Sequence, residues 1–203
     1  IAFAVGTHRM ARHKAIVRKM AAIETLGAMQ VVLVDKTGTI TQNVMRVKKF
    51  WLHKRSSFPQ LIQACVLGNT ASLVEKGNGT FDIIGDQTDG ALLLWAKQQK
   101  PSFVAPGGHM LDEYVFDTNT KIITTVWKKD GKKNVFVRGA PETIIAKSSL
   151  TAKEKAIMIK QFESFAKEGL RTIAFATKIE KHGKSTGRKH LEQDLHFLGF
   201  IGI

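Results

Sequence analysis

The densest group of chemically capable side chains lies in the run DKTGTIT at residues 35–41. It places a carboxylate (Asp35), an ammonium (Lys36), several hydroxyl groups and a glycine (Gly38) in one short loop. A carboxylate can attack a phosphoryl group and form an aspartyl phosphate if cations and backbone N–H groups offset the charge repulsion. Lys36 and the turn at Gly38 could supply them. An isolated aspartate more often caps a helix, but this ordered run favours a phosphoryl acceptor.

The elements expected around this loop are one helix and one buried strand. Residues 7–26 carry apolar side chains at helical spacing before Gly27, which predicts a single helix. Residues 31–34 form a short apolar, β-branched run, which is typical of a strand buried on both faces of a parallel sheet. Asp35 is therefore expected at the carboxyl end of a strand, where ligands bind in open α/β sheets.

After Asn43 the sequence predicts strands mixed with helices. The expected strands are residues 122–127, 135–138, 172–177 and 195–203, and the expected helices are residues 91–97, stopped by Pro101, and a longer one that ends at Gly169. The first two strands are joined through Asp130-Gly131, a strong hairpin signal. Thr151 and Glu154 form a capping-box pattern at the start of the long helix. The chain thus divides into an incomplete parallel α/β element and an antiparallel sheet with flanking helices.

The motifs, taken in order, resemble those of the type II cation-transporting P-type ATPases. DKTGTIT resembles the phosphorylation signature of this family, and residues 1–27 resemble the end of its fourth transmembrane helix and the stalk. The nucleotide-domain landmarks are GDQTDGAL at 85–92, the adenine-binding segment at 116–121, FVRGAPE at 136–142, GLR at 169–171 and FLG at 197–199. The resemblance therefore covers essentially the whole chain.

The resemblance implies roles for the phosphorylation loop. Asp35 is the implied nucleophile and a ligand to Mg²⁺, with Lys36 beside it. Thr37 is implied to bind Mg²⁺ through its carbonyl and the phosphoryl group through its hydroxyl. In the wider haloacid dehalogenase superfamily this position is usually a second aspartate. Because threonine cannot act as a general acid or base at neutral pH, the aspartyl phosphate would persist long enough to drive a conformational cycle.

The resemblance also implies an ATP site. Phe116 is implied to stack on adenine, Asp89 to meet the adenine edge, and Gly139 to belong to the triphosphate-binding turn, while Lys121, Arg138 and Arg171 are implied phosphate or ribose contacts. The family more often has Glu at position 89, Lys at 138 and Arg at 118. Alone, Phe116 would more often be a core aromatic on a strand, and each cation a solvated charge.

The implied organisation has three parts. Residues 1–43 would be the stalk helix and the N-terminal segment of the phosphorylation domain, residues 44–199 the nucleotide-binding domain, and residues 200–203 the start of a return hinge. The implied fold is a partial Rossmann-like element of the haloacid dehalogenase type followed by the antiparallel-sheet domain. The parent would be an ATP hydrolase and translocase in a membrane, with this region on its cytosolic face.

The implied partners are ATP, Mg²⁺ and the transmembrane and actuator domains of the pump. The chain lacks the distal aspartates and the actuator loop of the family, so alone it is expected to be soluble and inactive. The transported ion is not readable from these residues, although calcium is favoured.

There are two alternatives to this interpretation. A stand-alone phosphatase or phosphotransferase built on the same nucleophile would need the missing distal acids within this chain. A nucleic-acid-binding module is suggested by the formal charge of +14, but no motif supports it, and the basic stretch at residues 178–190 has no aromatic and is expected to be a solvated loop. The single cysteine, Cys65, lies in an apolar stretch and is expected to be a small buried hydrophobe in a reducing compartment.

Overall fold

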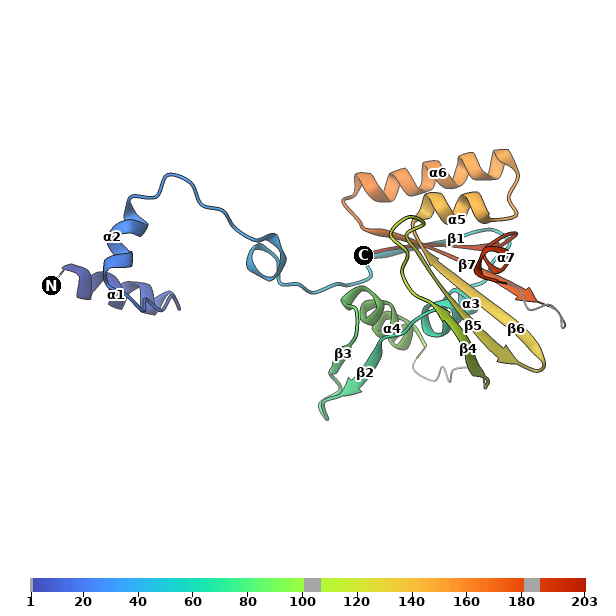
Figure 1. Cartoon of the computed structure of the whole chain (residues 1–203), viewed down its shortest axis with the longest axis horizontal. Helices are drawn as coiled ribbons and strands as arrows, with labels where there is room; N and C mark the ends of the chain where they lie inside the picture. Colours follow the sequence, from blue (N-terminus) through green and yellow to red (C-terminus); the bar gives the residue numbers. More distant parts are fainter. Residues whose placement is uncertain (1, 101–106, 181–186) are drawn as a thin grey trace. The chain divides into compact units, whose positions relative to one another are not determined.

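The structure of the chain is a computed structural model that describes residues 2–100, 107–180 and 187–203. Contacts divide the chain into two units, Ile1–Val44 and Met45–Ile203, and each is considered by itself (Figure 1). Pro101, expected to stop a helix, and residues 181–186 of the expected basic loop lie outside the described residues.

The first unit contains two short helices, α1 (Ala2–Arg12) and α2 (Ala21–Gly27), and neither has a buried residue. The single helix expected at residues 7–26 is therefore wrong. The chain leaves the helical conformation near Lys14, whose φ of 63° is in the left-handed region. Helices of this length depend on packing of an apolar face. Because neither helix has such packing, apolar spacing alone does not maintain one continuous helix.

The strand expected at residues 31–34 is also wrong. These residues have no strand pairing, and Leu33 is 95% exposed. A strand needs neighbours that satisfy its backbone groups and cover its side chains. Residues 2–44 contain no second strand that could do so. Asp35 consequently does not follow a strand, and the partial Rossmann-like element is not seen in this structure.

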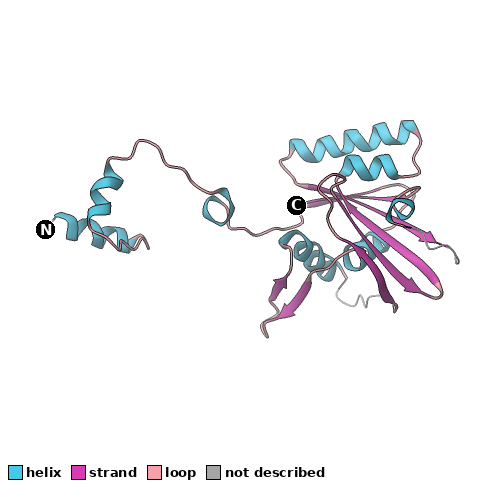
Figure 2. Cartoon of the chain, in the orientation of Figure 1, coloured by secondary structure: helices cyan, strands magenta, loops and turns pink. Residues whose placement is uncertain are grey.

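The second unit is built on a six-stranded sheet with the order β1-β8-β7-β6-β5-β4, in which every neighbouring pair is antiparallel (Figure 2). Its strands are β1 (Lys49–Leu52), β4 (His109–Tyr114), β5 (Ile122–Lys129), β6 (Lys132–Gly139), β7 (Thr172–Glu180) and β8 (His196–Gly202). The expected antiparallel sheet is confirmed. Residues 200–202 lie in β8, and the start of a return hinge at residue 200 stays a prediction.

Helices cover both faces of this sheet and create two hydrophobic cores (Figure 1). One core lies under α5 (Pro141–Lys147), α6 (Ala152–Lys167) and the short α7 (Arg188–Leu191), and the other under α3 (Phe58–Leu67) and α4 (Gln87–Gln99). A separate two-stranded sheet, β2 (Ser72–Glu75) and β3 (Phe81–Ile84), precedes α4. Cys65 is fully buried in the second core, as its apolar surroundings predict.

Local sequence signals explain the best-predicted elements. Asp130 and Gly131 join β5 to β6 with φ values of 49° and 72°, as a type I′ hairpin turn requires. Thr151 and Glu154 form the expected capping box, in which the Glu154 carboxylate accepts the Thr151 backbone N–H at 3.0 Å. The Thr151 bonds are the main cause that lowers the pKa of Glu154 to about 2.

His53, which follows β1, is a buried titratable group. It is 3% exposed and lies beside the rings of Trp51 and Phe197. Burial, followed by the charge of Arg55, lowers the pKa of its imidazole below 6.5. Between the folded and unfolded pKa values, the unfolded chain binds a proton that the folded chain does not. The contribution of neutral His53 to stability is therefore lost as pH falls through this interval.

We expect His53→Phe to lose less free energy of unfolding than the natural chain when pH falls from about 7.5 to about 5, where histidine titrates. A phenyl ring cannot take up the proton that favours the unfolded chain. Urea denaturation at both pH values measures the difference, with His109→Phe on the exposed strand β4 as the matched control. Equal pH dependence of the natural chain and His53→Phe would contradict this assignment.

Candidate functional site

Segments carrying predicted nucleotide contacts meet at one end of the six-stranded sheet. Phe116 and Lys121 lie in the loop between β4 and β5, Gly139 ends β6, and Arg171 directly precedes β7. Gly139 pairs with Ile122 at the start of β5 and with the first part of β7. Antiparallel pairing thus brings segments that are distant in sequence to the same end of the sheet (Figure 1).

Asp117 holds the loop between β4 and β5 in shape. Its carboxylate accepts the backbone N–H groups of Asn119 at 2.7 Å and Thr120 at 3.5 Å, and its carbonyl accepts that of Lys121 at 2.6 Å. The bond from Asn119 is the main cause that lowers the pKa of Asp117. Phe116 lies outside both strands and is 55% exposed, so a core aromatic on a strand is excluded.

Gly139 permits close approach between β6 and this loop. Its φ is 145°, and a Cβ added there would lie 2.2 Å from the Lys121 carbonyl oxygen and 2.8 Å from the Ile122 Cα. The N–H of Ala140 donates to the same Lys121 oxygen at 3.0 Å. A larger residue at position 139 would therefore displace the backbone that carries Lys121.

Arg138 and Asp89, expected as separate nucleotide contacts, form a buried ion pair with each other. Arg138 Nη2 lies 2.5 Å from Asp89 Oδ2, and the side chains are 6% and 5% exposed. Arg138 Nε also donates to the carbonyl of Gly68 at the end of α3. Burial raises the pKa of Asp89, and the Arg138 charge opposes that rise. The charged groups of both side chains are therefore already paired within the protein. Direct contacts from either residue to a nucleotide stay predictions.

Sequence reasoning missed the groups that complete this buried network. Asn69 is 8% exposed, and its Nδ2 donates to the carbonyl of Asp89 at 2.8 Å. Thr125 and Trp127 each donate to the carbonyl of Leu67 at 2.7 Å. The available signal was Gly-Asn directly after an apolar helix, which marks a helix end whose last carbonyl groups need donors.

The side chains of Lys121 and Arg171 are exposed at the same end of the sheet. The backbone of Arg171 is fixed, because its N–H and C=O groups both bond to Ile203 at 3.0 Å. Within residues 2–100, 107–180 and 187–203, neither side chain has an ion-pair partner. Both cations are thus available to an anionic ligand.

The Asp35 loop lies in the first unit and is exposed throughout. Asp35 Oδ1 accepts the N–H of Thr37 at 3.3 Å, and the N–H of Thr41 donates to the Lys36 carbonyl at 3.0 Å. Gly38 has a φ of 77°, which glycine adopts without the steric cost of a Cβ. These local bonds form an irregular turn, Lys36–Ile40, with an accessible carboxylate at its start.

The Asp35 loop supplies only part of a Mg²⁺ site. Mg²⁺ prefers about six oxygen ligands in octahedral geometry. The Asp35 carboxylate and the Thr37 carbonyl would fill two of these positions. Among the residues that the structure describes, no group of three histidine, cysteine, aspartate or glutamate side chains could hold a metal ion. These residues alone therefore do not fit a complete Mg²⁺ site.

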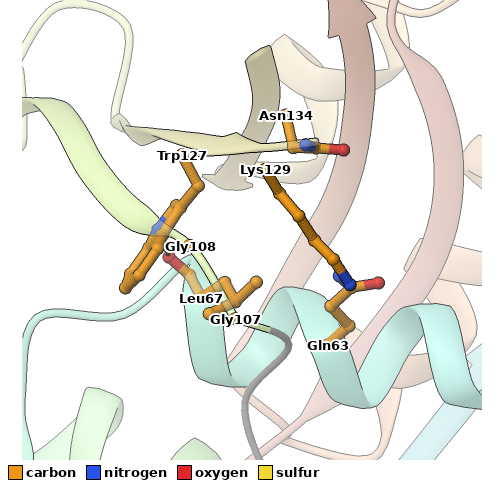
Figure 3. A pocket seen from close by; sticks show the side chains of 7 residues that line it. All are labelled: Gln63, Leu67, Gly107, Gly108, Trp127, Lys129 and Asn134. Atoms are coloured by element: carbon orange, nitrogen blue, oxygen red, sulfur yellow. Dashed lines mark hydrogen bonds between the residues drawn. The ribbon is translucent and has the colours of Figure 1, made fainter. Parts of the chain in front are cut away.

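Two hollows in the second unit contain none of the predicted nucleotide contacts. One, of about 10 Å³, lies beside Trp127 and Lys129, and the side chain of Lys129 extends toward Gln63 of α3 (Figure 3). This volume admits about one water molecule. The other, of about 200 Å³, is lined by His53 and His196 near the opposite end of the sheet. The candidate site remains the exposed end of the sheet at which Phe116 lies.

Comparison with known proteins identifies relatives of the whole chain. A family model described as "P-type ATPase, cytoplasmic domain N" matches residues 57–203. The chain is 32% identical to a "Probable cation-transporting P-type ATPase" of Mycoplasma genitalium and 29% identical to a "Calcium-transporting ATPase" of Bacillus subtilis. Each match covers 100% of this chain, but 23% and 27% of the respective relative. The chain thus spans about a quarter of the length of these curated relatives.

No helix in the described ranges is both long and apolar enough to cross a bilayer.

We expect Arg138→Met to lower the free energy of unfolding by about 3–5 kcal/mol, because the buried Asp89 carboxylate loses its counter-charge. Combining it with Asp89→Leu should recover much of this loss, since no unpaired charge then remains. Urea denaturation of the single and double variants tests both statements. Arg171→Met, at an exposed position, serves as the control and should change stability by less than about 0.5 kcal/mol. A loss below about 1 kcal/mol in Arg138→Met would refute the structural role of the pair.

Proposed function

This chain belongs to the P-type ATPase family, and we propose that it is the ATP-binding and aspartyl-phosphorylation region of a pump that moves cations across a membrane. The family assignment follows from the match to cytoplasmic domain N and from relatives that align over the entire chain. ATP binding would belong to the second unit, and phosphorylation to Asp35 in the first.

The pump activity is a property of a longer protein. Because the chain covers about a quarter of its relatives, the transmembrane and actuator domains are proposed partners. The Bacillus subtilis relative is named as a calcium-transporting ATPase, but residues that would select an ion are not identified in this chain. The proposal is therefore for cation transport, coupled to ATP hydrolysis, without a specified ion.

The observation that carries the ATP-binding proposal is an exposed aromatic beside exposed cations at one end of the sheet. Phe116 is 55% exposed and so offers ring surface on which adenine can stack. Lys121 and Arg171 offer cations for the phosphate groups or ribose. Gly139 keeps the end of β6 close to the Lys121 backbone, so these groups stand on a defined edge.

Arg138 and Asp89 contribute in a different way in this proposal. Their buried ion pair and the bond from Arg138 to Gly68 hold α3 and α4 against β6. Contacts of Asp89 with the adenine edge and of Arg138 with phosphate would require these polar groups to accept a ligand as an additional partner. We retain both as proposed nucleotide-binding residues. Their first role is to stabilise the end of the sheet at which Phe116 lies.

Asp35 is proposed as the acceptor of the γ-phosphoryl group. A carboxylate oxygen would form the new bond to phosphorus while the bond to the ADP leaving group breaks. Lys36 would offset negative charge, and the Thr37 hydroxyl would contact the phosphoryl group. Members of this family use ATP together with Mg²⁺. The ion would use Asp35 and the Thr37 carbonyl, with its remaining ligands supplied from outside the described residues.

We expect Phe116→Ala to weaken ATP binding by about tenfold or more, because base stacking on an aromatic contributes roughly 1–3 kcal/mol. Isothermal titration calorimetry of the whole chain measures this change. Leu111→Ala, an exposed apolar truncation on β4, is the matched control. Unchanged affinity in Phe116→Ala would remove this ring from the site.

Lys121→Ala should weaken ATP binding more than adenosine binding, because adenosine has no phosphate groups for the lysine to contact. Lys132→Ala, at the opposite end of the β5–β6 hairpin, is the charge-matched control. Parallel titrations with ATP and adenosine give the comparison. Equal losses of affinity for both ligands would show that Lys121 does not contact the phosphate groups.

We expect the 203-residue chain alone to show negligible ATP turnover, since the residues that the structure describes do not form a complete Mg²⁺ site around Asp35. Asp35→Asn should leave its ATP affinity unchanged, because the proposed nucleotide contacts lie in the second unit. Phosphate release and calorimetric titration measure the two quantities. Rapid turnover that disappears in Asp35→Asn would contradict the first expectation, and lost affinity would contradict the second.

A further inference from the structure

Arg188, the first residue of α7, bridges the elements around the Phe116 loop. Its Nε lies 2.7 Å from Glu192 Oε1, and its Nη2 donates to the carbonyl of Ile122 at 3.4 Å. Its Nη1 lies 4.0 Å from the carboxylate of Asp117. One guanidinium thus faces the start of β5 and the residue that shapes the β4–β5 loop.

The counter-charge of Arg188 is anchored in the protein interior. Glu192 is 3% exposed, and its Oε1 accepts the hydroxyl of the fully buried Thr124 at 2.8 Å. Lys147 Nζ lies 3.7 Å from the other carboxylate oxygen. Because Glu192 is held by β5 and α5, it fixes the direction in which the Arg188 fork points.

We propose that Arg188 is a positioning residue for adenine recognition, which orders the β4–β5 loop so that Phe116 is presented in a single arrangement. This inference rests on the proposed ATP-binding function. It assigns Arg188 no direct contact with the nucleotide. Its guanidinium faces Glu192, the Ile122 carbonyl and Asp117, and its side chain is 28% exposed.

A second anchor limits the size of the expected effect. Thr143 of α5 donates its hydroxyl to the carbonyl of Thr120 at 2.9 Å, so the loop retains one tether without Arg188. Affinity falls in proportion to the fraction of molecules with a binding-competent loop. Loss of Arg188 should therefore weaken binding by about three- to tenfold, with similar factors for ATP and adenosine.

The test compares Arg188→Met with Lys189→Met, its exposed neighbour on the same helix. Calorimetric titrations with ATP and with adenosine are made on the whole chain, alone and in combination with Phe116→Ala. We expect Arg188→Met to weaken both ligands and Lys189→Met to change neither. In the Phe116→Ala background, Arg188→Met should cause no further loss of adenosine affinity, because it acts on this ligand through the ring that is no longer present.

Three results would overturn the proposal. The first is equal affinities of Arg188→Met and Lys189→Met. The second is a loss confined to ATP, which indicates a direct phosphate contact. The third is a loss of adenosine affinity that adds fully to that of Phe116→Ala. Should Arg188→Met fail to fold because Glu192 is left unbalanced, Arg188→Gln with Glu192→Gln removes both charges and is held to the same outcomes.

Backbone ¹⁵N order parameters of residues 115–121 separate this inference from the proposed function. They should fall in Arg188→Met relative to the natural chain, whether or not a nucleotide binds. If the natural chain binds no adenine ligand, the proposed function fails, and lower order parameters would still support the ordering role. Unchanged order parameters would refute that role independently of any ligand.

Discussion

The buried ion pair between Arg138 and Asp89 is the interaction on which the nucleotide-facing half of the second unit depends. It links β6 to the first turn of α4, and the bond from Arg138 to the Gly68 carbonyl adds the end of α3. A buried charge is tolerated only when it is paired, so removal of either partner leaves the other at a high energetic cost. The position of both helices on the sheet is therefore coupled to one contact between charged groups.

This coupling separates charges that maintain the structure from charges that are free to bind. Arg138 is buried and paired with Asp89, whereas Lys121 and Arg171 remain exposed at the same end of the sheet. The opposite face repeats the arrangement, since buried Glu192 orients Arg188 toward the β4–β5 loop. Two networks, one on each face of the sheet, thus fix the end of the sheet that lies between them. The exposed ring of Phe116 lies at that end.

The sequence predicts elements whose signals are local and fails where a partner is required. The β5–β6 turn at Asp130-Gly131 and the capping box at Thr151 depend on a few adjacent residues, and both are confirmed. Residues 31–34 have strand-like composition but no neighbouring strand in the first unit, so they remain unpaired. The types of the site residues were readable, but the pairing of Asp89 with Arg138 was not, because it joins positions 49 residues apart.

The central claim is that a nucleotide binds at the sheet end formed by the β4–β5 loop, the end of β6 and the start of β7. Mapping amide chemical shifts of the ¹⁵N-labelled chain during an ATP titration tests it most directly. The account predicts that the largest changes fall at residues 116–121, 139–140 and 171, with little change near His53 or in the Asp35 loop. Changes concentrated at His53 and His196, or at residues 35–41, would contradict it.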